Sequence, residues 1–333
     1  MPSLQSAMNA IPGGGRIYYS ARWLRRLLRL WRDPNRQFLA YPPGHFCSPL
    51  PNVDELQRDH PRLSDTTIAS LPGIELHVAE QLERLASFRP LFAEQRFAEH
   101  STSGQRYSFE NAFFTYSDAL FLYAMLRDLR PKRVVEIGSG FSSALMLDVR
   151  DQFFELKPEL TFVEPYPTRL NTLLTPADRQ TCTVLEQRVQ EVPFERFDAL
   201  EANDILFIDS SHVSKIGSDV NHLFFEILPR LRPGVVVHIH DIFWPFEYPR
   251  SWYDLGWAWN ETYLLRAMLL GQRDWKILLF SSYLEAHHAT KLACASPLLM
   301  SRAKATPSTG GSSIWLRKTS HRAEPLSLST SRG

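Results

Sequence analysis

The chain has 333 residues, of which 44% are hydrophobic and 22% charged, so it can bury a large core and is not a disordered or collagen-like protein. Its 37 basic and 36 acidic side chains give a net charge of +1, which argues against binding of nucleic acid through a broad basic surface. The three cysteines lie far apart, which excludes a zinc ribbon and a disulfide framework and is typical of a reducing compartment: Cys47, Cys182 and Cys294. No apolar stretch approaches the roughly 18 to 20 residues that span a bilayer, so we do not expect an integral membrane protein.

The N-terminal segment, residues 1–36, is basic. Its first acidic residue is Asp33, and six arginines precede it. Apolar side chains recur there at the spacing of one helix face: Leu24, Leu27, Leu28 and Trp31. The pattern predicts a basic amphipathic helix over residues 18–32. Such a helix could dock on the protein or on a partner subunit of a homo-oligomer, lie on a membrane surface, or be a cleaved organellar presequence, and the sequence leaves these interpretations open.

Residues 37–114 are expected to form an N-terminal extension that is helical or irregular. Several prolines and Gly44 lie between residues 41 and 52; because proline fixes φ and lacks a donor, they predict an irregular segment. This segment also contains many aromatic and apolar side chains, so we interpret it as an arm or lid rather than a linker. At the other end, the Ser- and Arg-rich residues 319–333 are expected to form a disordered tail.

Residues 115–318 show alternating strand and helix patterns. The predicted strands are 133–137, 160–164, 181–185, 204–209, 235–240, 275–280 and 312–317. The predicted helices are 117–130, 141–150, 168–174, 218–231 and 260–270. This alternation predicts an α/β fold, a Rossmann-like doubly wound sheet with helices on both faces. A ligand site is then expected at the carboxyl ends of the strands.

A glycine turn follows the first predicted strand and opens the next helix. Gly138 and Gly140 allow the backbone to turn tightly and to approach a ligand closely. A pyrophosphate site would have a third glycine where this chain has Ser143, and Glu136 would repel a pyrophosphate. The turn, with Ser139 between its glycines, therefore favours a cationic or amine-bearing ligand, although such a turn can also be purely structural.

Glu164 ends the second predicted strand. A carboxylate in this place can accept hydrogen bonds from both ribose hydroxyls of a nucleoside. The alternative is a charge that stabilises the N-terminus of the following helix. We favour ribose binding because the glycine turn lies in register on the neighbouring strand.

Polar side chains end the fourth and fifth predicted strands. Asp209 ends the fourth strand, and His212 lies three residues further on. His240 and Asp241 end the fifth strand. Because these strands are expected to be adjacent and parallel, their side chains can converge above the sheet. His238 shares a strand face with His240 and is expected to be a buried, hydrogen-bonded structural histidine.

An aromatic segment, broken by prolines, follows the fifth predicted strand. Aromatic faces can stack on a sugar ring or a flat acceptor, and they exclude water from the site. Several of these rings can also belong to the core of the helix that follows. We expect Trp244, Tyr248 and Trp252 to lie nearer the substrate than Trp257 or Trp259.

Several stretches of the chain, taken in order, resemble one known family. They are Tyr41-Pro-Pro-Gly-His-Phe, the Glu136 turn, Glu164-Pro-Tyr-Pro, Ile208-Asp-Ser-Ser-His, His238-Ile-His-Asp-Ile-Phe, Trp259-Asn-Glu and Gly310-Gly-Ser-Ser-Ile-Trp-Leu. Over residues 40–318 the chain resembles class I S-adenosylmethionine-dependent methyltransferases, of the subfamily associated with O-methyltransferases that tailor glycans and natural products. The resemblance implies a seven-stranded sheet with an antiparallel last strand and S-adenosylmethionine as cofactor. It places these residues at the cofactor: Glu136, Gly138, Ser139, Gly140, Glu164 and Asp209.

The ends of the fourth and fifth strands are similar to those of metal-dependent O-methyltransferases. By that resemblance, Asp209, His240 and Asp241 would hold a divalent cation, Mg²⁺ or Mn²⁺. His212 would be the base that takes the substrate proton, while the cation lowers the pKa of the coordinated hydroxyl. This chain departs from the family pattern, because it has His240 before Asp241 and a histidine, not a lysine, at position 212. Without a metal, Asp209 and His212 would only bind substrate or cap the following helix.

Together these features predict an O-methyltransferase that acts on a hydroxyl of a sugar-containing or phenolic small molecule, with Asp209 and His212 as catalytic residues. A sugar is favoured because the aromatic segment is large. Two other functions stay open. A related transferase could move an aminopropyl group, but it would need an acidic polyamine channel. A non-catalytic scaffold could keep the fold and dock on membranes through residues 18–32, so the protein is expected in the cytoplasm or at the membrane periphery.

Overall fold

The computed structural model describes residues 40–271, 273–304 and 310–320. The predicted basic helix and nearly all of the predicted tail lie outside these residues. The chain forms two compact units, Met1–Pro61 and Arg62–Gly333. The division into four segments that the sequence suggests stays a prediction.

The described part of the first unit consists of turns followed by the start of a helix. The Gly44 N–H donates to the Leu50 carbonyl oxygen at 3.2 Å, which closes one of these turns. Helix α3 (Val53–Leu63) follows Asn52, whose side-chain oxygen accepts the Asp54 N–H at 2.9 Å. An Asn side chain in this place satisfies a backbone donor that has no partner within the helix.

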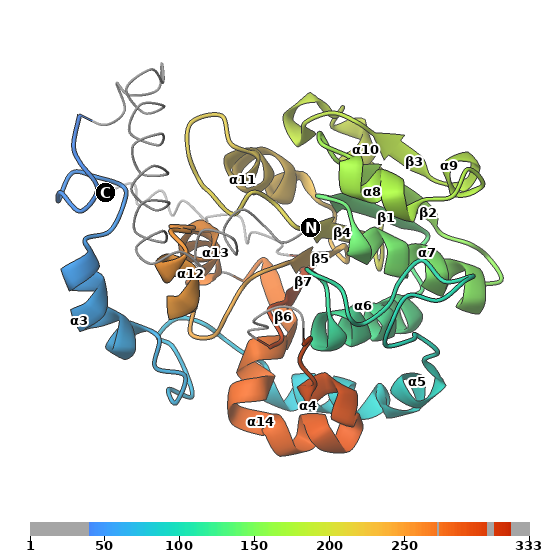
Figure 1. The fold of residues 1–333 in the computed structure, drawn as a ribbon, viewed down its shortest axis with the longest axis horizontal. Helices are drawn as coiled ribbons and strands as arrows, with labels where there is room; N and C mark the ends of the chain where they lie inside the picture. The colour runs from blue at the N-terminus through green and yellow to red at the C-terminus, as the bar shows by residue number, and fades with distance from the viewer. Residues whose placement is uncertain (1–39, 272, 305–309, 321–333) are drawn as a thin grey trace, which may run out of the picture. The chain divides into compact units, whose positions relative to one another are not determined.

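The second unit is built on a seven-stranded sheet in the order β3-β2-β1-β4-β5-β7-β6 (Figure 1). The strands are β1 (Arg133–Ile137), β2 (Glu159–Val163), β3 (Thr183–Leu185), β4 (Ile205–Ile208), β5 (Val236–Ile239), β6 (Trp275–Phe280) and β7 (Ile314–Lys318). Strands β1 to β5 pair in parallel, and β7 runs antiparallel to both β5 and β6. The predicted α/β fold with an antiparallel last strand is therefore confirmed.

Helices connect the strands and cover the sheet. They are α4 (Val78–Ser87), α5 (Arg89–Glu94), α6 (Tyr116–Leu129), α7 (Phe141–Phe153), α8 (Thr168–Leu173), α9 (Asp178–Thr181), α10 (Glu195–Asp198), α11 (Asp219–His222), α12 (Arg250–Asp254), α13 (Glu261–Leu269) and α14 (Ser281–Ala295). No bounds were predicted for the helices of the N-terminal extension, α3, α4 and α5, and α9, α10, α12 and α14 were not predicted. The expected helix 218–231 is divided into α11, a π-helical turn and a 3₁₀ turn that contains Pro229, which has no N–H to donate. Within the described ranges, no helix is long and apolar enough to cross a membrane.

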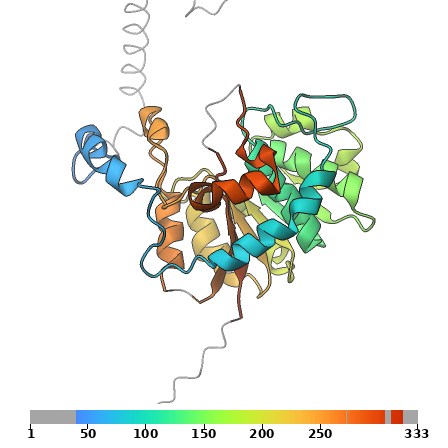
Figure 2. The ribbon, with the colours of Figure 1, turned by 90° about the horizontal axis from the view of Figure 1, so that it is seen from below.

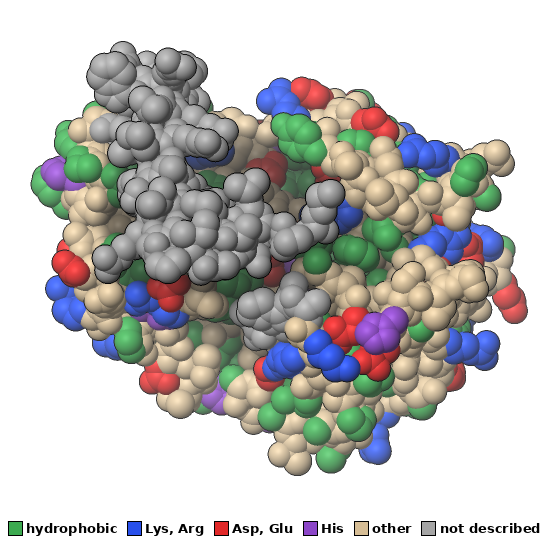
Figure 3. All heavy atoms as spheres, viewed as in Figure 1, with side chains coloured by type: hydrophobic (Ala, Val, Ile, Leu, Met, Phe, Trp, Pro, Cys, Tyr) green, Lys and Arg blue, Asp and Glu red, His purple; other side chains and the backbone are tan. Residues whose placement is uncertain are grey.

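The core lies between the sheet and helices that are apolar on most of their surface. Almost every side chain of α6 is buried, as expected for a helix packed on several sides. Helices α4, α6 and α14 pack together, and α4 also contacts β6 (Figure 2). On the face shown in Figure 3, acidic and basic side chains are interspersed, in agreement with the balanced composition.

The register of the parallel strands brings four chain segments to one edge of the sheet. Ile137 at the end of β1 pairs with Val163 of β2 on one side and with Ile208 of β4 on the other. Ile208 in turn pairs with Ile239 of β5. The residues that directly follow these strand ends therefore lie side by side, and they include the site residues predicted from the sequence.

Candidate active site

A cavity of about 330 Å³ lies at this edge of the sheet. One side is formed by the glycine turn together with Glu164 and Arg169, and the other by residues 209–212, His240, Asp241 and Trp259. Phe113 and Phe114, which precede α6, complete the lining. The cavity thus joins the predicted cofactor residues to the predicted acceptor residues in a single space.

The glycine turn is fixed by backbone contacts with both neighbouring strands. The Gly138 N–H donates to the Val163 carbonyl oxygen at 2.9 Å, and the Asp209 N–H donates to the Ile137 carbonyl oxygen at 2.8 Å. Gly138 has a φ of +79°, and a Cβ built on it would lie 1.9 Å from the carbonyl oxygen of Asp209. Only glycine fits at this position, for both its conformation and its space.

Glu136 stabilises the glycine turn and does not line the cavity. Its side chain is fully buried, and its carboxyl oxygens accept hydrogen bonds from Ser142 Oγ, at 2.6 Å, and from Ser143 Oγ. Ser143 Oγ in turn accepts the Gly140 N–H at 2.9 Å. Burial raises the pKa of Glu136 to about 8, although the serine hydroxyls partly oppose this shift. The expected contact of Glu136 with a ligand is thus indirect in this structure, through the shape of the turn.

Glu164 lines the cavity next to the glycine turn. Its Oε2 accepts the Ser139 N–H at 3.1 Å, and its Oε1 accepts the Tyr166 N–H at 2.7 Å. These two backbone donors hold the carboxylate beside the turn. Its remaining lone pairs can accept two further donors, which is the requirement for binding a pair of ribose hydroxyls.

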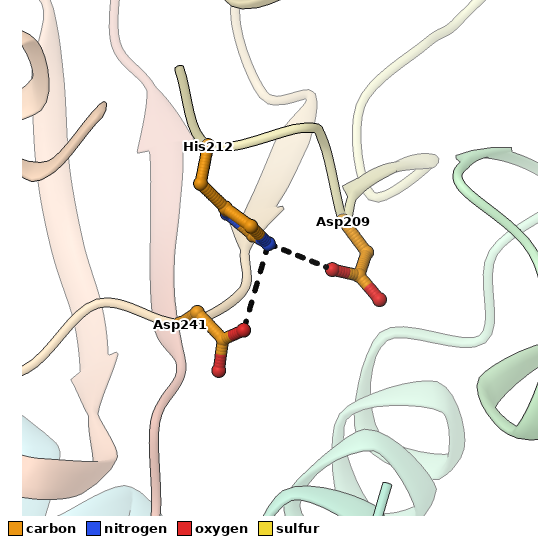
Figure 4. A group of neighbouring side chains, drawn as sticks. All are labelled: Asp209, His212 and Asp241. Carbon is orange, nitrogen blue, oxygen red and sulfur yellow. Dashed lines mark ion pairs between the residues drawn. The ribbon is translucent and has the colours of Figure 1, made fainter. Parts of the chain in front are cut away.

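Asp209, His212 and Asp241 meet on the other side of the cavity (Figure 4). The Nε2 atom of His212 lies 3.4 Å from Asp209 Oδ1 and 3.5 Å from Asp241 Oδ2. His212 and Asp241 both have a positive φ, 58° and 56°, so the chain turns sharply after β4 and after β5 and directs these side chains toward one another. One ligand atom from each of the three residues lies within 4.8 Å of the others. Two carboxylates and an imidazole are a donor set that a divalent cation accepts.

A fourth residue, Glu261 at the start of α13, completes this group and was not assigned a role from the sequence. Its Oε2 lies 2.9 Å from Nδ1 of His212, on the opposite side of the ring from the two aspartates. The Trp259 ring packs on the His212 ring with the centroids 4.4 Å apart. The signal for it in the sequence is the Trp259-Asn-Glu stretch, which belongs to the family resemblance.

The electrostatics of this group favour positive charge at its centre. Burial by itself would lower the pKa of His212, but its contacts with Asp209 and Glu261 raise it well above the ordinary value. Burial would raise the pKa of Asp209, yet His212 and His240 lower it below its ordinary value. The pKa of Asp241 is raised, mainly by burial. A histidinium or a bound cation would thus be stabilised between the aspartates.

In this structure His212, and not His240, groups with the two aspartates, while a role of His240 in holding a cation stays a prediction. His240 lines the cavity, and its Nε2 lies 3.6 Å from Asp241 Oδ1, but it is not part of the three-residue group. Its ring lies against Phe114 with the centroids 5.2 Å apart. The left-handed backbone at Asp241 turns that side chain toward His212, while His240 keeps the strand alternation and packs beside His238.

The prediction that His238 is buried and hydrogen-bonded is right about burial and wrong about the hydrogen bond. The side chain is fully buried as expected, but neither ring nitrogen has a hydrogen-bond partner among the described residues. The ring stacks on Phe207 at 3.9 Å between centroids and meets the edge of Trp315 at 4.6 Å. Burial lowers the pKa of His238 well below its ordinary value, so it is a neutral, apolar-packed histidine.

The aromatic segment is arranged differently from the prediction. Trp244 is 2% exposed, and its Nε1–H donates to the Ile68 carbonyl oxygen at 2.9 Å, so it belongs to the core. Tyr248 is fully buried as well. It is Trp259, predicted to lie farther away, that lines the cavity. Trp252 packs behind it with the ring centroids 5.0 Å apart.

Comparisons with known sequences include a match to the part of the chain that contains most of the residues lining this cavity. The model of a family described as "Methyltransferase domain" matches residues 135–242, which include the glycine turn and all three residues of the group in Figure 4. A protein of Archaeoglobus fulgidus, described as an uncharacterized protein, is 37% identical over 172 residues. That match covers 50% of this chain and 76% of the other protein.

Three solved structures resemble the chain at low sequence identity. The apo structure of CmcI-N160 is 15% identical with a TM-score of 0.41, and the match covers 70% of this chain and 84% of that chain. The O-methyltransferase TomG from Streptomyces achromogenes, in complex with SAM, is 16% identical with a TM-score of 0.36 and coverages of 72% and 90%. The O-methyltransferase from Bacillus cereus, in complex with SAH, is 11% identical with a TM-score of 0.37 and coverages of 79% and 97%.

Proposed function

We propose that this chain, whose residues 135–242 match a methyltransferase-domain model, transfers a methyl group from S-adenosylmethionine to a hydroxyl oxygen of a sugar-containing or phenolic small molecule. One observation carries the proposal. The cavity that the glycine turn and Glu164 line on one side is lined on the other by Asp209, His212 and Asp241. A nucleoside site and a proton-accepting site in one space are what methyl transfer to oxygen requires.

The cofactor side uses the glycine turn and Glu164. S-adenosylmethionine supplies an electrophilic methyl group on a sulfonium centre. The backbone of Gly138, Ser139 and Gly140 lets the nucleoside approach closely, because no side chain stands in the way. The Glu164 carboxylate accepts the ribose hydroxyls and thereby fixes the direction in which the methyl group points.

The acceptor side uses His212 as the base. Nε2 of His212 faces the cavity between Asp209 and Asp241, at 3.4 and 3.5 Å. When the ring is neutral, Nε2 takes the hydroxyl proton as the new carbon–oxygen bond forms and the carbon–sulfur bond breaks, so turnover should increase as pH rises toward the raised pKa of His212. The two aspartates stabilise the imidazolium that results. Transfer is in line and forms no covalent enzyme intermediate, so most of the rate enhancement comes from positioning.

Asp209 and Asp241 are the residues that would hold a divalent cation, Mg²⁺ or Mn²⁺. Their oxygens lie on either side of Nε2 of His212, and the raised pKa of His212 indicates that the site stabilises positive charge. A cation bound by these oxygens would lower the pKa of the acceptor hydroxyl and orient it, while Nε2 stays free to take the proton.

The acceptor class follows from the aromatic lining. Trp259 lies in the cavity wall beside His212, and Phe113 lines the cavity with 60% of its surface exposed. Flat aromatic faces next to the base can stack on a sugar ring or on a phenol. We favour a sugar-containing acceptor, with the phenol as the second choice.

The test is an assay for S-adenosylhomocysteine formation with a panel of glycosides and phenols, in buffer with Mn²⁺ or Mg²⁺. We expect turnover with one class, and we expect His212→Gln to reduce it by about 100-fold or more, since a general base contributes about 10²- to 10⁴-fold. His100→Gln, a change at an exposed histidine, is the control and should leave the rate unchanged. Full activity of His212→Gln, or turnover only with decarboxylated S-adenosylmethionine and a polyamine, would contradict the proposal.

A further inference from the structure

We infer that Glu261 is a positioning residue for His212: it holds the proton on Nδ1 and leaves Nε2 free to face Asp209 and Asp241. The inference rests on the proposed function for its catalytic meaning, but the proton position itself is a property of the folded chain. Glu261 is fully buried and does not line the cavity, so it acts on the acceptor only through His212.

The side chains of Glu261 and Ser210 hold His212 through connected hydrogen bonds. The Glu261 Oε2 lies 2.9 Å from Nδ1 of His212 and also accepts the Ser210 hydroxyl at 2.9 Å. The Ser210 oxygen in turn accepts the backbone N–H of His212 at 2.9 Å. One carboxylate oxygen thus fixes both the ring and, through Ser210, the backbone of the same residue.

Backbone hydrogen bonds at the start of α13 fix the position of Glu261 relative to His212. The N–H groups of Asn260 and Glu261 both donate to the carbonyl oxygen of His212, at 3.0 and 3.2 Å. The Asn260 Oδ1 accepts the Ser214 N–H at 2.6 Å. The first residue of α13 and the loop after β4 are therefore tied together on both sides of His212, and the Glu261 carboxylate has a fixed position relative to the ring.

The chemistry of the contact decides where the proton lies. Both ring nitrogens face carboxyl groups, but the contact of Nδ1 with Glu261, at 2.9 Å, is shorter than the contacts of Nε2 with Asp209 and Asp241, at 3.4 and 3.5 Å. A neutral ring therefore keeps its single proton on Nδ1, in the hydrogen bond to Glu261. The other nitrogen, Nε2, then keeps its lone pair when the ring is neutral. A neutral histidine in water prefers the opposite tautomer, with the proton on Nε2. Without Glu261, the proton would therefore occupy the position at which His212 must accept the hydroxyl proton.

A purely structural role for Glu261 would be to tie the loop after β4 to α13. The same loop has a matched contact of that kind, in which Asp219 accepts the Ser211 N–H at 2.7 Å and the Ser211 hydroxyl at 2.5 Å. Within the part of the chain that the structure describes, no hydrogen bond or ion pair joins Asp219 to His212. Asp219→Asn is therefore the control, because it weakens a carboxylate contact that ties the same loop but does not alter the contacts of the His212 ring.

The experiment is nuclear magnetic resonance on the full-length chain labelled with ¹⁵N-histidine, in EDTA and at a pH where His212 is neutral. Long-range proton–nitrogen correlations show which ring nitrogen carries the proton, and His212→Gln identifies the signals of His212. We expect the proton on Nδ1 in the wild type and in Asp219→Asn, and on Nε2 in Glu261→Ala. The readout needs neither cofactor nor acceptor, so it is independent of whether methyl transfer is observed.

Glu261→Gln keeps the inference testable if the alanine variant fails to fold. Its side-chain oxygen can still accept the Nδ1 proton, so the tautomer should persist, while the Nδ1 proton signal moves upfield because the acceptor has lost its charge. Once an acceptor is known, the turnover rate of this variant should fall about 10- to 100-fold, with the affinity for S-adenosylhomocysteine unchanged. A wild-type ring protonated on Nε2, an unchanged signal in both Glu261 variants, or the same change in Asp219→Asn would overturn the inference.

Discussion

The carbonyl oxygen of Asp209 approaches Gly138 so closely that a Cβ built on residue 138 would lie only 1.9 Å from it. The turn at Gly138 and the start of the acceptor loop at Asp209 are thus in direct backbone contact. Because β1 and β4 are adjacent and parallel, this contact fixes the distance between the glycine turn and the loop that carries His212 without an intervening flexible segment. In the proposed reaction, the geometry of methyl transfer is consequently set by the sheet itself.

Gly138→Ala should therefore destabilise the protein and abolish cofactor binding. We expect the unfolding free energy to fall by more than about 2 kcal/mol, because the positive φ and the steric overlap act together. Thermal unfolding followed by circular dichroism, and calorimetric titration with S-adenosylhomocysteine, measure the two effects. The control is Gly217→Ala, which has a φ of +70° but no atom within 4 Å of the new Cβ, and should cost only about 1 kcal/mol. Equal effects of the two changes would contradict the close contact.

Glu164→Gln should weaken binding of S-adenosylhomocysteine by about 10- to 100-fold, because hydrogen bonds to a charged group contribute about 1.5 to 3 kcal/mol. A titration with the 2′-deoxy analogue separates ribose binding from a general effect on the turn. If Glu164 binds the ribose, the wild type should bind this analogue more weakly than S-adenosylhomocysteine. The Glu164→Gln variant should bind the two ligands with nearly the same affinity. Glu159→Gln, an exposed change on the same strand, serves as the control. Additive losses would show that Glu164 acts elsewhere.

Glu136 should make the stability of the protein depend on pH. Its carboxyl keeps a proton up to a pKa of about 8 in the folded chain, whereas the ordinary value is 4.5. Between these values the folded state binds more protons than the unfolded state, so stability is highest below the lower value and falls as pH rises toward 8. Glu136→Gln cannot titrate, and its melting temperature relative to the wild type should rise steadily from pH 5 to 8.5.

The expected gain of Glu136→Gln at the upper end of this range is on the order of a few kcal/mol. The amide can still pair with Ser142 and Ser143, so the turn should keep its shape. Glu159→Gln is again the control and should give a difference that does not vary with pH. A constant difference for Glu136→Gln would mean that the buried carboxyl does not hold its proton.

Asp209→Asn and Asp241→Asn should each weaken Mn²⁺ binding by about 10-fold or more, because each removes a charged oxygen ligand. Electron paramagnetic resonance of free Mn²⁺ measures this directly. The affinity for S-adenosylhomocysteine should stay close to that of the wild type, and Asp219→Asn should behave like the wild type in both titrations. Loss of cofactor binding in Asp209→Asn would place Asp209 in the cofactor site instead, and unchanged Mn²⁺ binding would remove the cation from the account.

Much of the fold could be predicted because strand patterns and strand ends are local properties. Strands β1 and β6 begin and end at the predicted residues, and Gly138, Glu164 and Asp209 stand at the carboxyl ends of β1, β2 and β4 as expected. Helix α14 was missed because its polar and apolar residues are not separated onto two faces and it is kinked at His288. Periodicity detects an amphipathic helix and gives no signal for such a segment.

The site could be predicted only as far as the chain neighbourhood determines it. The contact between His212 and Glu261 joins residues 49 positions apart, and no local pattern encodes it. The choice between His212 and His240 depends on positive φ values at His212 and Asp241, which non-glycine residues rarely adopt. Trp244 is buried in the core and Trp259 lines the cavity, the reverse of the prediction, because burial depends on which elements pack against each ring.

The measurement that tests the account most directly is calorimetric titration of the full chain with S-adenosylmethionine, once in EDTA and once with Mn²⁺ or Mg²⁺. We expect micromolar binding in both buffers and none in Gly138→Ala, because the glycine turn and Glu164 form the cofactor site without the cation. Absence of binding in both buffers, from a wild-type protein with a cooperative thermal transition, would contradict the central claim that this cavity is a methyltransferase site.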